Sequence, residues 1–220
     1  MKIISGFKHP STFTWNMWID NLKLSAERFG HEVMTFDLPT TDVWIAGHYE
    51  LYLSLCWKYK IVFLQEAVNT IKDDLLWIDG DCLVMKEINY DDIMSDCDVA
   101  LTLRDVRDRC LTSQPDRDGL INSGVIFLKN TIRTRQFLQM CRNQLLISLY
   151  DQEAINRVLL KKSKIDRHQE IITLSGIKIK ILSCREYNNF YFDSTTDNAK
   201  IVHFKSQGRQ LYNNYVKGLC

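Results

Sequence analysis

The sequence lacks long apolar runs, strong net charge and frequent proline. It has no uninterrupted apolar stretch of about 18 residues, as a membrane-spanning helix needs, and the apolar run in residues 1–6 is too short for a signal peptide. With 28 basic and 27 acidic residues the net charge is +1, which gives no global indication of nucleic-acid or membrane binding. The 220 residues include only three prolines, and 45% of the residues are hydrophobic. This composition excludes a fibrous or disordered chain. We therefore expect an intracellular protein without membrane insertion.

The cysteines do not follow the patterns of disulfide-rich or zinc-binding proteins. Their number is odd, they are dispersed along the chain, and no two of them form a C-x-x-C pair. We therefore predict reduced thiols that fill positions in the core. The cysteines are Cys56, Cys82, Cys97, Cys110, Cys141, Cys184 and Cys220.

Apolar runs of strand length alternate with longer segments whose apolar residues recur at three- and four-residue steps. The predicted strands are residues 2–7, 32–36, 75–78, 99–103, 125–128 and 201–204. The predicted helices are residues 15–29 and 131–149, with one or two more in 48–71. Two further apolar runs surround Ser175 and Gly176, which favours a hairpin over residues 171–182. The alternation predicts a single α/β domain with a mostly parallel central sheet flanked by helices, and a small C-terminal β-hairpin region.

Two carboxylates, Asp79 and Asp81, follow the predicted strand in the segment LLWIDGDCLV, residues 75–84. Ligands of open α/β sheets bind beyond the carboxyl ends of the strands, which is where this pair is expected. Two unpaired carboxylates buried side by side would be strongly destabilising, and a divalent cation such as Mg²⁺ or Mn²⁺ removes that difficulty. The motif alone leaves two interpretations open: the polar end of an ordinary strand, or a metal site.

Four further segments, taken in chain order with this D-x-D motif, make the sequence resemble the nucleotide-sugar-dependent glycosyltransferases with the A-type (GT-A) fold. They are KIVFLQEA (60–67), INSGVIFL (121–128), YDQEAIN (150–156) and IVHF (201–204). Three of them have a simpler structural interpretation: a turn at residues 122–124, a helix N-cap at Asp151, and a core histidine at His203. The resemblance implies a Rossmann-like GT-A domain over residues 1–220, with a nucleotide-binding half (1–100) and an acceptor and catalytic half (101–220).

The resemblance implies a divalent ion, Mn²⁺ or Mg²⁺, that holds the diphosphate of a nucleoside-diphosphate sugar, with UDP-sugars as the expected donors. Asp81 and His203 are implied as direct metal ligands, and Asp79 as a contact to the ribose or to the metal through water. One divalent ion does not neutralise a diphosphate together with two aspartates, so we expect further cations near the phosphates. The candidates are Lys60, Lys205 and Arg209.

The other implied contacts lie at the base, the sugar and the reacting carbon. Asp151 and Gln152 resemble the catalytic pair of retaining members, family eight above all, although Asp151 could also serve as the general base of an inverting enzyme. The chain departs from family eight after His203, where its H-x-x-G-x-x-K-P-W ending is replaced, so the subfamily stays open. The expected binding residues are Ser5, Gly6 and Phe7 at the base, and Asn122, Ser123 and Gly124 at the donor sugar.

Two rival functions remain at this stage. One is a phosphatase of the haloacid-dehalogenase type with Asp79 as its nucleophile, although the residues after Asp81 do not fit that motif. The other is a non-catalytic module that binds nucleotide sugars. The acceptor is open among a glycan, a protein and a modified nucleic acid base, and we expect cytoplasmic action in a bacterium or a virus-infected cell.

Overall fold

The computed structural model describes residues 1–8, 13–37, 49–104, 120–148, 150–160, 170–194, 196–204 and 211–217. The strands are β1 (Lys2–Lys8), β2 (Val33–Asp37), β3 (Leu75–Ile78), β4 (Cys82–Val84), β5 (Val99–Leu103), β6 (Ile121–Leu128), β7 (Ile171–Leu174), β8 (Ile177–Ser183) and β9 (Ile201–His203). The helices are α1 (Phe13–Glu27), α3 (Tyr49–Thr70), α4 (Tyr90–Met94), α7 (Ile132–Gln144), α8 (Asp151–Leu160), α9 (Cys184–Tyr187) and α10 (Tyr212–Val216), with a 3₁₀ turn at Thr196–Asn198.

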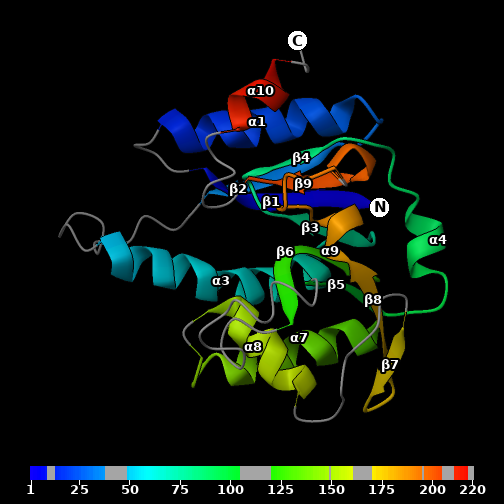
Figure 1. Ribbon diagram of the computed structural model, residues 1–220. Helices are drawn as coiled ribbons and strands as arrows, with labels where there is room; N and C mark the ends of the chain where they lie inside the picture. The colour runs from blue at the N-terminus through cyan, green and yellow to red at the C-terminus, as the bar shows by residue number, and fades with distance from the viewer. Residues whose placement is uncertain are drawn as a thin grey trace.

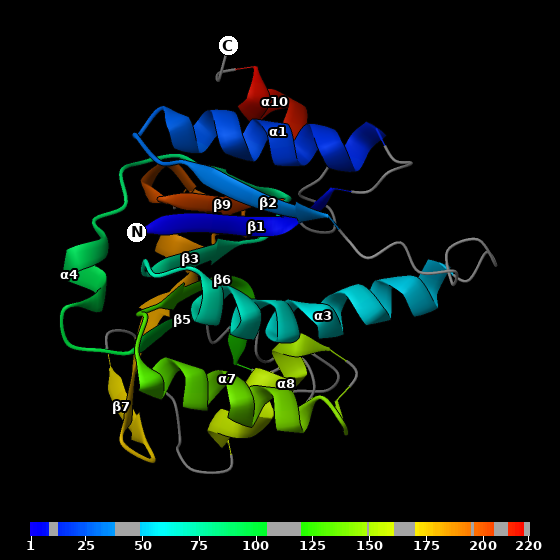
Figure 2. The ribbon, with the colours of Figure 1, turned by 180° about the vertical axis from the view of Figure 1, so that it is seen from behind.

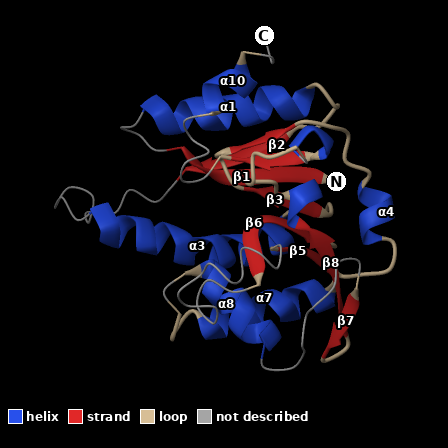
Figure 3. Cartoon of the chain, in the orientation of Figure 1, coloured by secondary structure: helices blue, strands red, loops and turns tan. Residues whose placement is uncertain are grey.

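Helices cover both faces of a central sheet (Figures 1 and 3). Helix α1 lies on one face with α10 beside it, and α3, α7 and α8 lie together on the other face, as the view from behind also shows (Figure 2). This layered arrangement confirms the predicted α/β class. Among the described residues, no helix is both long and apolar enough to span a bilayer.

The main sheet has seven strands in the order β2-β1-β3-β6-β5-β8-β7. Strand β6 is antiparallel to both of its neighbours and β7 is antiparallel to β8, whereas the other three pairs are parallel. Five strands therefore point one way and two the other, so the sheet is mixed although most strands share a direction. Because β6 runs against β3, the carboxyl end of β3 and the amino end of β6 meet at one edge.

Strand β3 is buried on both faces, which explains why its sequence is an unbroken apolar run. Leu75 and Trp77 lie in the core cluster that includes α3 and α7, whereas Leu76 and Ile78 lie in the cluster that includes α1. A strand covered on both faces needs apolar side chains at every position, not only at alternate ones. The same packing delivers Asp79 to the edge of the sheet directly after Ile78.

Strand β6 begins at Ile121, well before the predicted start at Val125, so Asn122, Ser123 and Gly124 belong to a strand and not to a turn. The pairing of β5 with β6 shifts register between Leu101 and Thr102. Irregularities of this kind bend a strand and are common beside functional sites.

The predicted hairpin is confirmed as β7 and β8. Ser175 and Gly176 have φ angles of 52° and 82°, as a two-residue turn with both central residues in the left-handed region requires. The segment for which one or two helices were predicted is the single helix α3. The four cysteines that the structure describes with their side chains, Cys82, Cys97, Cys141 and Cys184, are buried and form no disulfide.

Replacing Phe137 by alanine should lower the free energy of unfolding by about 3–5 kcal/mol. The Phe137 ring is fully buried in the cluster that joins α7 to α3 and the sheet. Urea-induced unfolding measures the loss. Ile132→Ala on the same helix is the control, because Ile132 is 67% exposed and should change stability by no more than about 0.5 kcal/mol. Equal losses for the two substitutions would contradict the packing of α7.

Candidate functional site

The two aspartates of the D-x-D motif lie in the turn that connects β3 to β4. The Asp79 N–H donates to the Gly124 carbonyl at 2.8 Å, which extends the β3–β6 contact by one residue. The Cys82 N–H donates back to the Asp79 carbonyl at 3.1 Å and closes the turn. Strand β4 then pairs with β9, where Cys82 stands opposite His203. This pairing carries His203 to the motif from more than 100 residues further along the chain.

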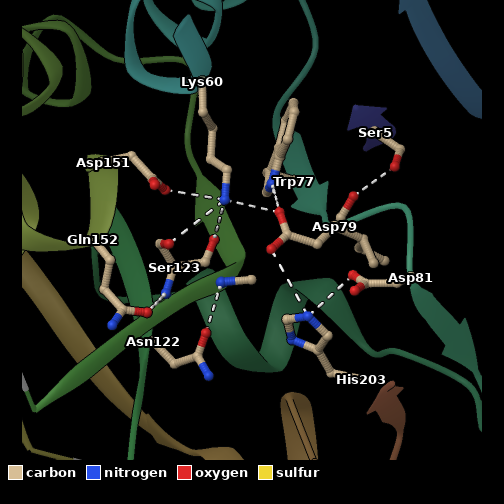
Figure 4. Close-up of polar contacts among 12 residues, drawn as sticks. Ser5, Lys60, Trp77, Asp79, Asp81, Asn122, Ser123, Asp151, Gln152 and His203 are labelled. Carbon is tan, nitrogen blue, oxygen red and sulfur yellow. Dashed lines mark hydrogen bonds and ion pairs between the residues drawn. The ribbon is translucent and has the colours of Figure 1, made fainter. Parts of the chain in front are cut away.

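Asp81, His203 and Asp79 point their ligand atoms toward one another (Figure 4). The His203 Nε2 lies 3.1 Å from Asp81 Oδ1 and 3.9 Å from Asp79 Oδ2. Asp81 and His203 are 5% and 4% exposed. Two carboxylates and one imidazole nitrogen form a donor set that suits a divalent ion, and the nitrogen favours a transition ion such as Mn²⁺ over Mg²⁺. The residues present therefore fit the implied metal.

Cys82 is a neighbour of this set that the sequence assigned to the core. Its Sγ belongs, with a carboxylate oxygen of Asp81 and a ring nitrogen of His203, to a group of ligand atoms that all lie within 4.8 Å of one another. The side chain is fully buried, as a core thiol would be. Cys82 directly follows Asp81, and the β4–β9 pairing brings it opposite His203, which the local sequence could not reveal.

Lys60 extends from α3 into the space between Asp79 and Asp151 (Figure 4). Its Nζ lies 2.8 Å from Asp79 Oδ1 and 3.0 Å from Asp151 Oδ2, and it donates to the Ser123 carbonyl at 3.2 Å. The residue is only 6% exposed. Burial by itself would lower the pKa of Lys60, but the charges of Asp151 and Asp79 outweigh it and hold that pKa above its ordinary value. Lys60 is therefore a buried cation already engaged by protein oxygens.

Trp77 is a second residue of the site that the sequence did not single out. Its indole N–H donates to Asp79 Oδ1 at 2.8 Å, and the Lys60 ammonium lies 5.5 Å from the centre of its ring. One oxygen of Asp79 is thus held by Lys60 and Trp77, whereas the other faces His203. Asp81 has no such contact with Lys60 among the described interactions, so the two aspartates have different surroundings.

The amino end of β6 lies between Lys60 and His203 and contacts both. The side-chain oxygen of Asn122 accepts a hydrogen bond from the Gly124 N–H at 3.0 Å. Gly124 packs directly under the histidine: a Cβ built on it would lie 2.6 Å from both Cε1 and Nδ1 of His203. Real Cβ atoms do not approach this closely, so the glycine is what allows the His203 ring to take its position.

Asp151 and Gln152 begin α8 and lie beside the amino end of β6. Asp151 is 3% exposed, and the Gln152 side-chain oxygen accepts from the Ser123 N–H at 3.4 Å. One turn later, Asn156 accepts from the Ile121 N–H at 3.0 Å and donates to the Ile121 carbonyl at 3.1 Å. Asn156 thereby fastens α8 to the start of β6 and fixes where Asp151 and Gln152 stand.

The predicted nucleotide contacts are placed only in part. The Ser5 hydroxyl donates to the Ile78 carbonyl at 2.6 Å and is fully buried, so it ties β1 to β3. Gly6 has room beside it, since an added Cβ would meet only the Trp77 ring at 3.7 Å. The backbone of Phe7 belongs to β1, but its side chain, like all of Lys205 and Arg209, lies outside the described residues.

Comparisons with known proteins identify a family and agree with the fold. A family model described as nucleotide-diphospho-sugar transferase matches residues 61–218. A solved glycosyltransferase involved in glycosylation of the major capsid of PBCV-1 is similar, with 13% identity and a TM-score of 0.64 over 98% of both chains. The galactosyltransferase LgtC, solved with donor and acceptor sugar analogs, is similar with 12% identity and a TM-score of 0.59, over 99% of this chain and 96% of that one. Among curated proteins, none matches the sequence at a significant level.

Gly124→Ala should lower the free energy of unfolding by about 1–3 kcal/mol, as overpacking of a filled site does, and should displace the His203 ring. Chemical unfolding measures the first effect, and the NMR shifts of the His203 ring measure the second. Gly6→Ala is the matched control, because its added methyl would make only an ordinary contact with Trp77. If Gly124→Ala left both the stability and the ring signals unchanged, the position of the His203 ring against Gly124 would be wrong.

Proposed function

We propose, from the premise that the chain belongs to the nucleotide-diphospho-sugar transferase family, that it is a metal-dependent glycosyltransferase that uses a UDP-sugar and retains the anomeric configuration. The family match establishes sugar transfer from a nucleotide-diphospho-sugar. The observation that carries the metal requirement is the convergence of Asp79, Asp81 and His203 at one edge of the sheet. The uridine base is proposed because the sequence motifs resemble those of this family, and the cytoplasmic location stays a prediction.

Asp81 and His203 would hold the ion directly, with Asp79 as the weaker or water-mediated partner. Asp79 shares one oxygen between Lys60 and Trp77, so only its other oxygen is oriented for the ion. When bound, a divalent ion stabilises the negative charge that develops on the leaving diphosphate. The contribution of the protein is to hold these ligands with Gly124 beneath the ring of His203, so that little reorganisation is needed on binding.

Lys60 orients carboxylates in this proposal, in place of the phosphate contact expected from the sequence. The positive charge of Lys60 is matched by the carboxylates of Asp79 and Asp151, and its ammonium group donates a hydrogen bond to the Ser123 carbonyl. Moving Lys60 to a phosphate would leave the buried carboxylate of Asp151 without its partner, which is strongly unfavourable, and would also remove the cation beside the partly exposed Asp79. The phosphate-binding cations proposed for the site are therefore Lys205 and Arg209.

Asp151 and Gln152 are the proposed catalytic pair on the sugar side. A general base must reach the acceptor hydroxyl, but Asp151 is almost fully buried and its Oδ2 is engaged by Lys60. This disfavours Asp151 as a general base. It favours retaining transfer in which the more accessible Gln152 offers its oxygen to the positive charge on the anomeric carbon, and the carboxylate of Asp151 adds negative charge nearby. The stereochemistry is measured directly by ¹H NMR of the first-formed product.

The donor sugar is proposed to lie over the start of β6, where Asn122 offers a hydrogen-bond donor. The Asn122 Nδ2 is buried, and among the described residues no group accepts a hydrogen bond from it. Its Oδ1 is already held by the Gly124 N–H, which fixes the orientation of the amide. A buried donor of this kind favours a ligand that supplies an oxygen, such as a sugar hydroxyl.

The rival functions are less well supported by the geometry. A nucleophilic Asp79, as a haloacid-dehalogenase phosphatase needs, would have one oxygen tied to both Lys60 and Trp77, and the family match is to sugar transferases. A non-catalytic module would bind a nucleotide sugar with Mn²⁺ but turn over no donor. A screen of donors by hydrolysis, extended to glycan, protein and nucleic acid acceptors, separates these functions.

Asp81→Asn should abolish metal-dependent hydrolysis of the donor while leaving the fold intact. The loss of Mn²⁺ affinity should exceed the roughly 10- to 100-fold typical of losing a group behind a metal ligand, because Asp81 is proposed as a ligand itself. Isothermal titration with Mn²⁺ and a hydrolysis assay measure the two effects. Asp73→Asn, an exposed aspartate outside the site, is the control. Unchanged Mn²⁺ affinity in Asp81→Asn would refute the metal site.

Gln152→Ala should lower kcat by about 100-fold or more with little change in the KM for the donor, because its role is proposed for the transition state. Steady-state kinetics with varied donor measure the split. Gln136→Ala, on the exposed face of α7, controls for the loss of a glutamine. A rise in KM at unchanged kcat would show that Gln152 only binds the substrate.

A further inference from the structure

A chain of three hydrogen bonds runs behind His203, on the side away from Asp81. The His203 Nδ1 lies 2.9 Å from the side-chain oxygen of Asn188. The Asn188 Nδ2 donates to the Thr102 hydroxyl at 2.9 Å, and that hydroxyl donates to the Asn122 carbonyl at 2.9 Å. All four residues are buried, so each of these groups depends on its protein partner.

The direction of the chain follows from its last member. The Asn122 carbonyl can only accept, so the one hydrogen of the Thr102 hydroxyl is committed to it. The hydroxyl can then only accept from Asn188, which must present its NH₂ group to Thr102 and its oxygen to His203. An amide oxygen accepts but does not donate, so the hydrogen between the two side chains belongs to Nδ1 of His203.

We propose that Asn188, oriented by Thr102, is a positioning residue that fixes His203 in the tautomer with its hydrogen on Nδ1, so that the lone pair of Nε2 faces the metal site. This inference rests on the proposed function only for its consequence, which is metal affinity. The assignment of the tautomer stands on the hydrogen bonds alone. Neither Asn188 nor Thr102 lies in a segment with a recognisable motif.

The opposite tautomer would give Asp81 a hydrogen bond but would remove the one to Asn188. A hydrogen on Nε2 would point at Asp81 Oδ1, 3.1 Å away, and would block that nitrogen as a ligand. It would also set the lone pair of Nδ1 against the Asn188 oxygen at 2.9 Å, two acceptors in contact. The chain from Asn122 to His203 disfavours this state. In the state that it favours, the lone pair of Nε2 lies 3.1 Å from Asp81 Oδ1, and these two acceptors form a donor set that a bound cation would satisfy.

The backbone holds the two partners in register. The His203 N–H donates to the Asn189 carbonyl at 2.7 Å, and the Asn189 N–H donates to the Ile201 carbonyl at 2.9 Å. Gly124 closes the other side, since a Cβ there would lie 3.2 Å from the Asn188 oxygen as well as against the His203 ring. His203 and Asn188 are thus fixed by main-chain contacts that substitution of the Asn188 side chain would leave in place.

The tautomer is measured in the metal-free protein by long-range ¹H–¹⁵N NMR of His203, in weakly alkaline buffer in which ordinary imidazoles are neutral. The wild type should show hydrogen on Nδ1. Thr102→Val, nearly equal in shape, leaves the Asn188 amide without its fixed orientation and should produce a detectable population with hydrogen on Nε2. Hydrogen on Nε2 in the wild type, or an unchanged single tautomer in Thr102→Val, would overturn the inference.

Metal affinity is measured separately by titrating Mn²⁺ and following the electron paramagnetic resonance signal of the free ion. Asn188→Leu removes the acceptor and should weaken Mn²⁺ binding about 10- to 100-fold. Asn188→Asp keeps an acceptor toward Nδ1 and should restore most of the affinity, which a merely structural role would not do. Circular dichroism confirms folding, and the Thr102→Val measurement decides if Asn188→Leu does not fold.

The two proposals fail in different ways. Equal Mn²⁺ affinity of Asn188→Leu and the wild type overturns the role of Asn188 and leaves the metal site standing. A wild type that shows hydrogen on Nδ1 but binds no Mn²⁺ supports the tautomer and overturns the proposed metal site.

Discussion

The rest of the site depends on the two ion pairs that the buried Lys60 ammonium forms with Asp79 and Asp151. A lone buried cation would be unstable, and so would the buried Asp151 carboxylate without it. Removal of one partner from a buried ion pair typically costs about 3–5 kcal/mol. Lys60 comes from α3, Asp79 follows β3, Asp151 begins α8, and the Ser123 carbonyl belongs to β6. The packing of α3 and α8 on the sheet therefore sets the geometry of the site, and the charges at the site in turn hold those elements together.

Lys60 also divides the site into two halves with different chemistry. On one side, the free oxygen of Asp79 joins Asp81 and His203 in a donor set for a divalent ion. On the other side, Asp151 stands beside the start of β6, where a sugar is proposed to bind. Each half has a buried amide behind it: Asn188 contacts the histidine, and Asn156 contacts the main chain of β6. These amides explain how polar groups can be buried at a sheet edge and still hold one orientation.

Local sequence patterns predicted β3, which is apolar throughout, β5, which is apolar except for Thr102, and the turn at Ser175 and Gly176. They missed the first part of β6, because Asn122 and Ser123 are polar, and the contacts that stabilise them in a buried strand include partners distant in sequence, such as Thr102 and Lys60. The reversed direction of β6 was also invisible, since periodicity does not carry strand direction. Motif resemblance indicated Asp81 and His203, which the structure places in contact. It could not indicate Trp77, Thr102 or Asn188, whose roles arise from pairings between strands and helices far apart in the chain.

The central claim, that the D-x-D turn and the histidine of β9 form one metal site, is tested most directly by diffraction at the manganese absorption edge. Crystals grown with Mn²⁺ and UDP should show an anomalous peak within bonding distance of Asp81 Oδ1 and His203 Nε2. Asp79 Oδ2 should lie beside the ion, and Lys60 should remain between Asp79 and Asp151. An anomalous peak at any other place, or none at this edge of the sheet while UDP is bound, would contradict the account.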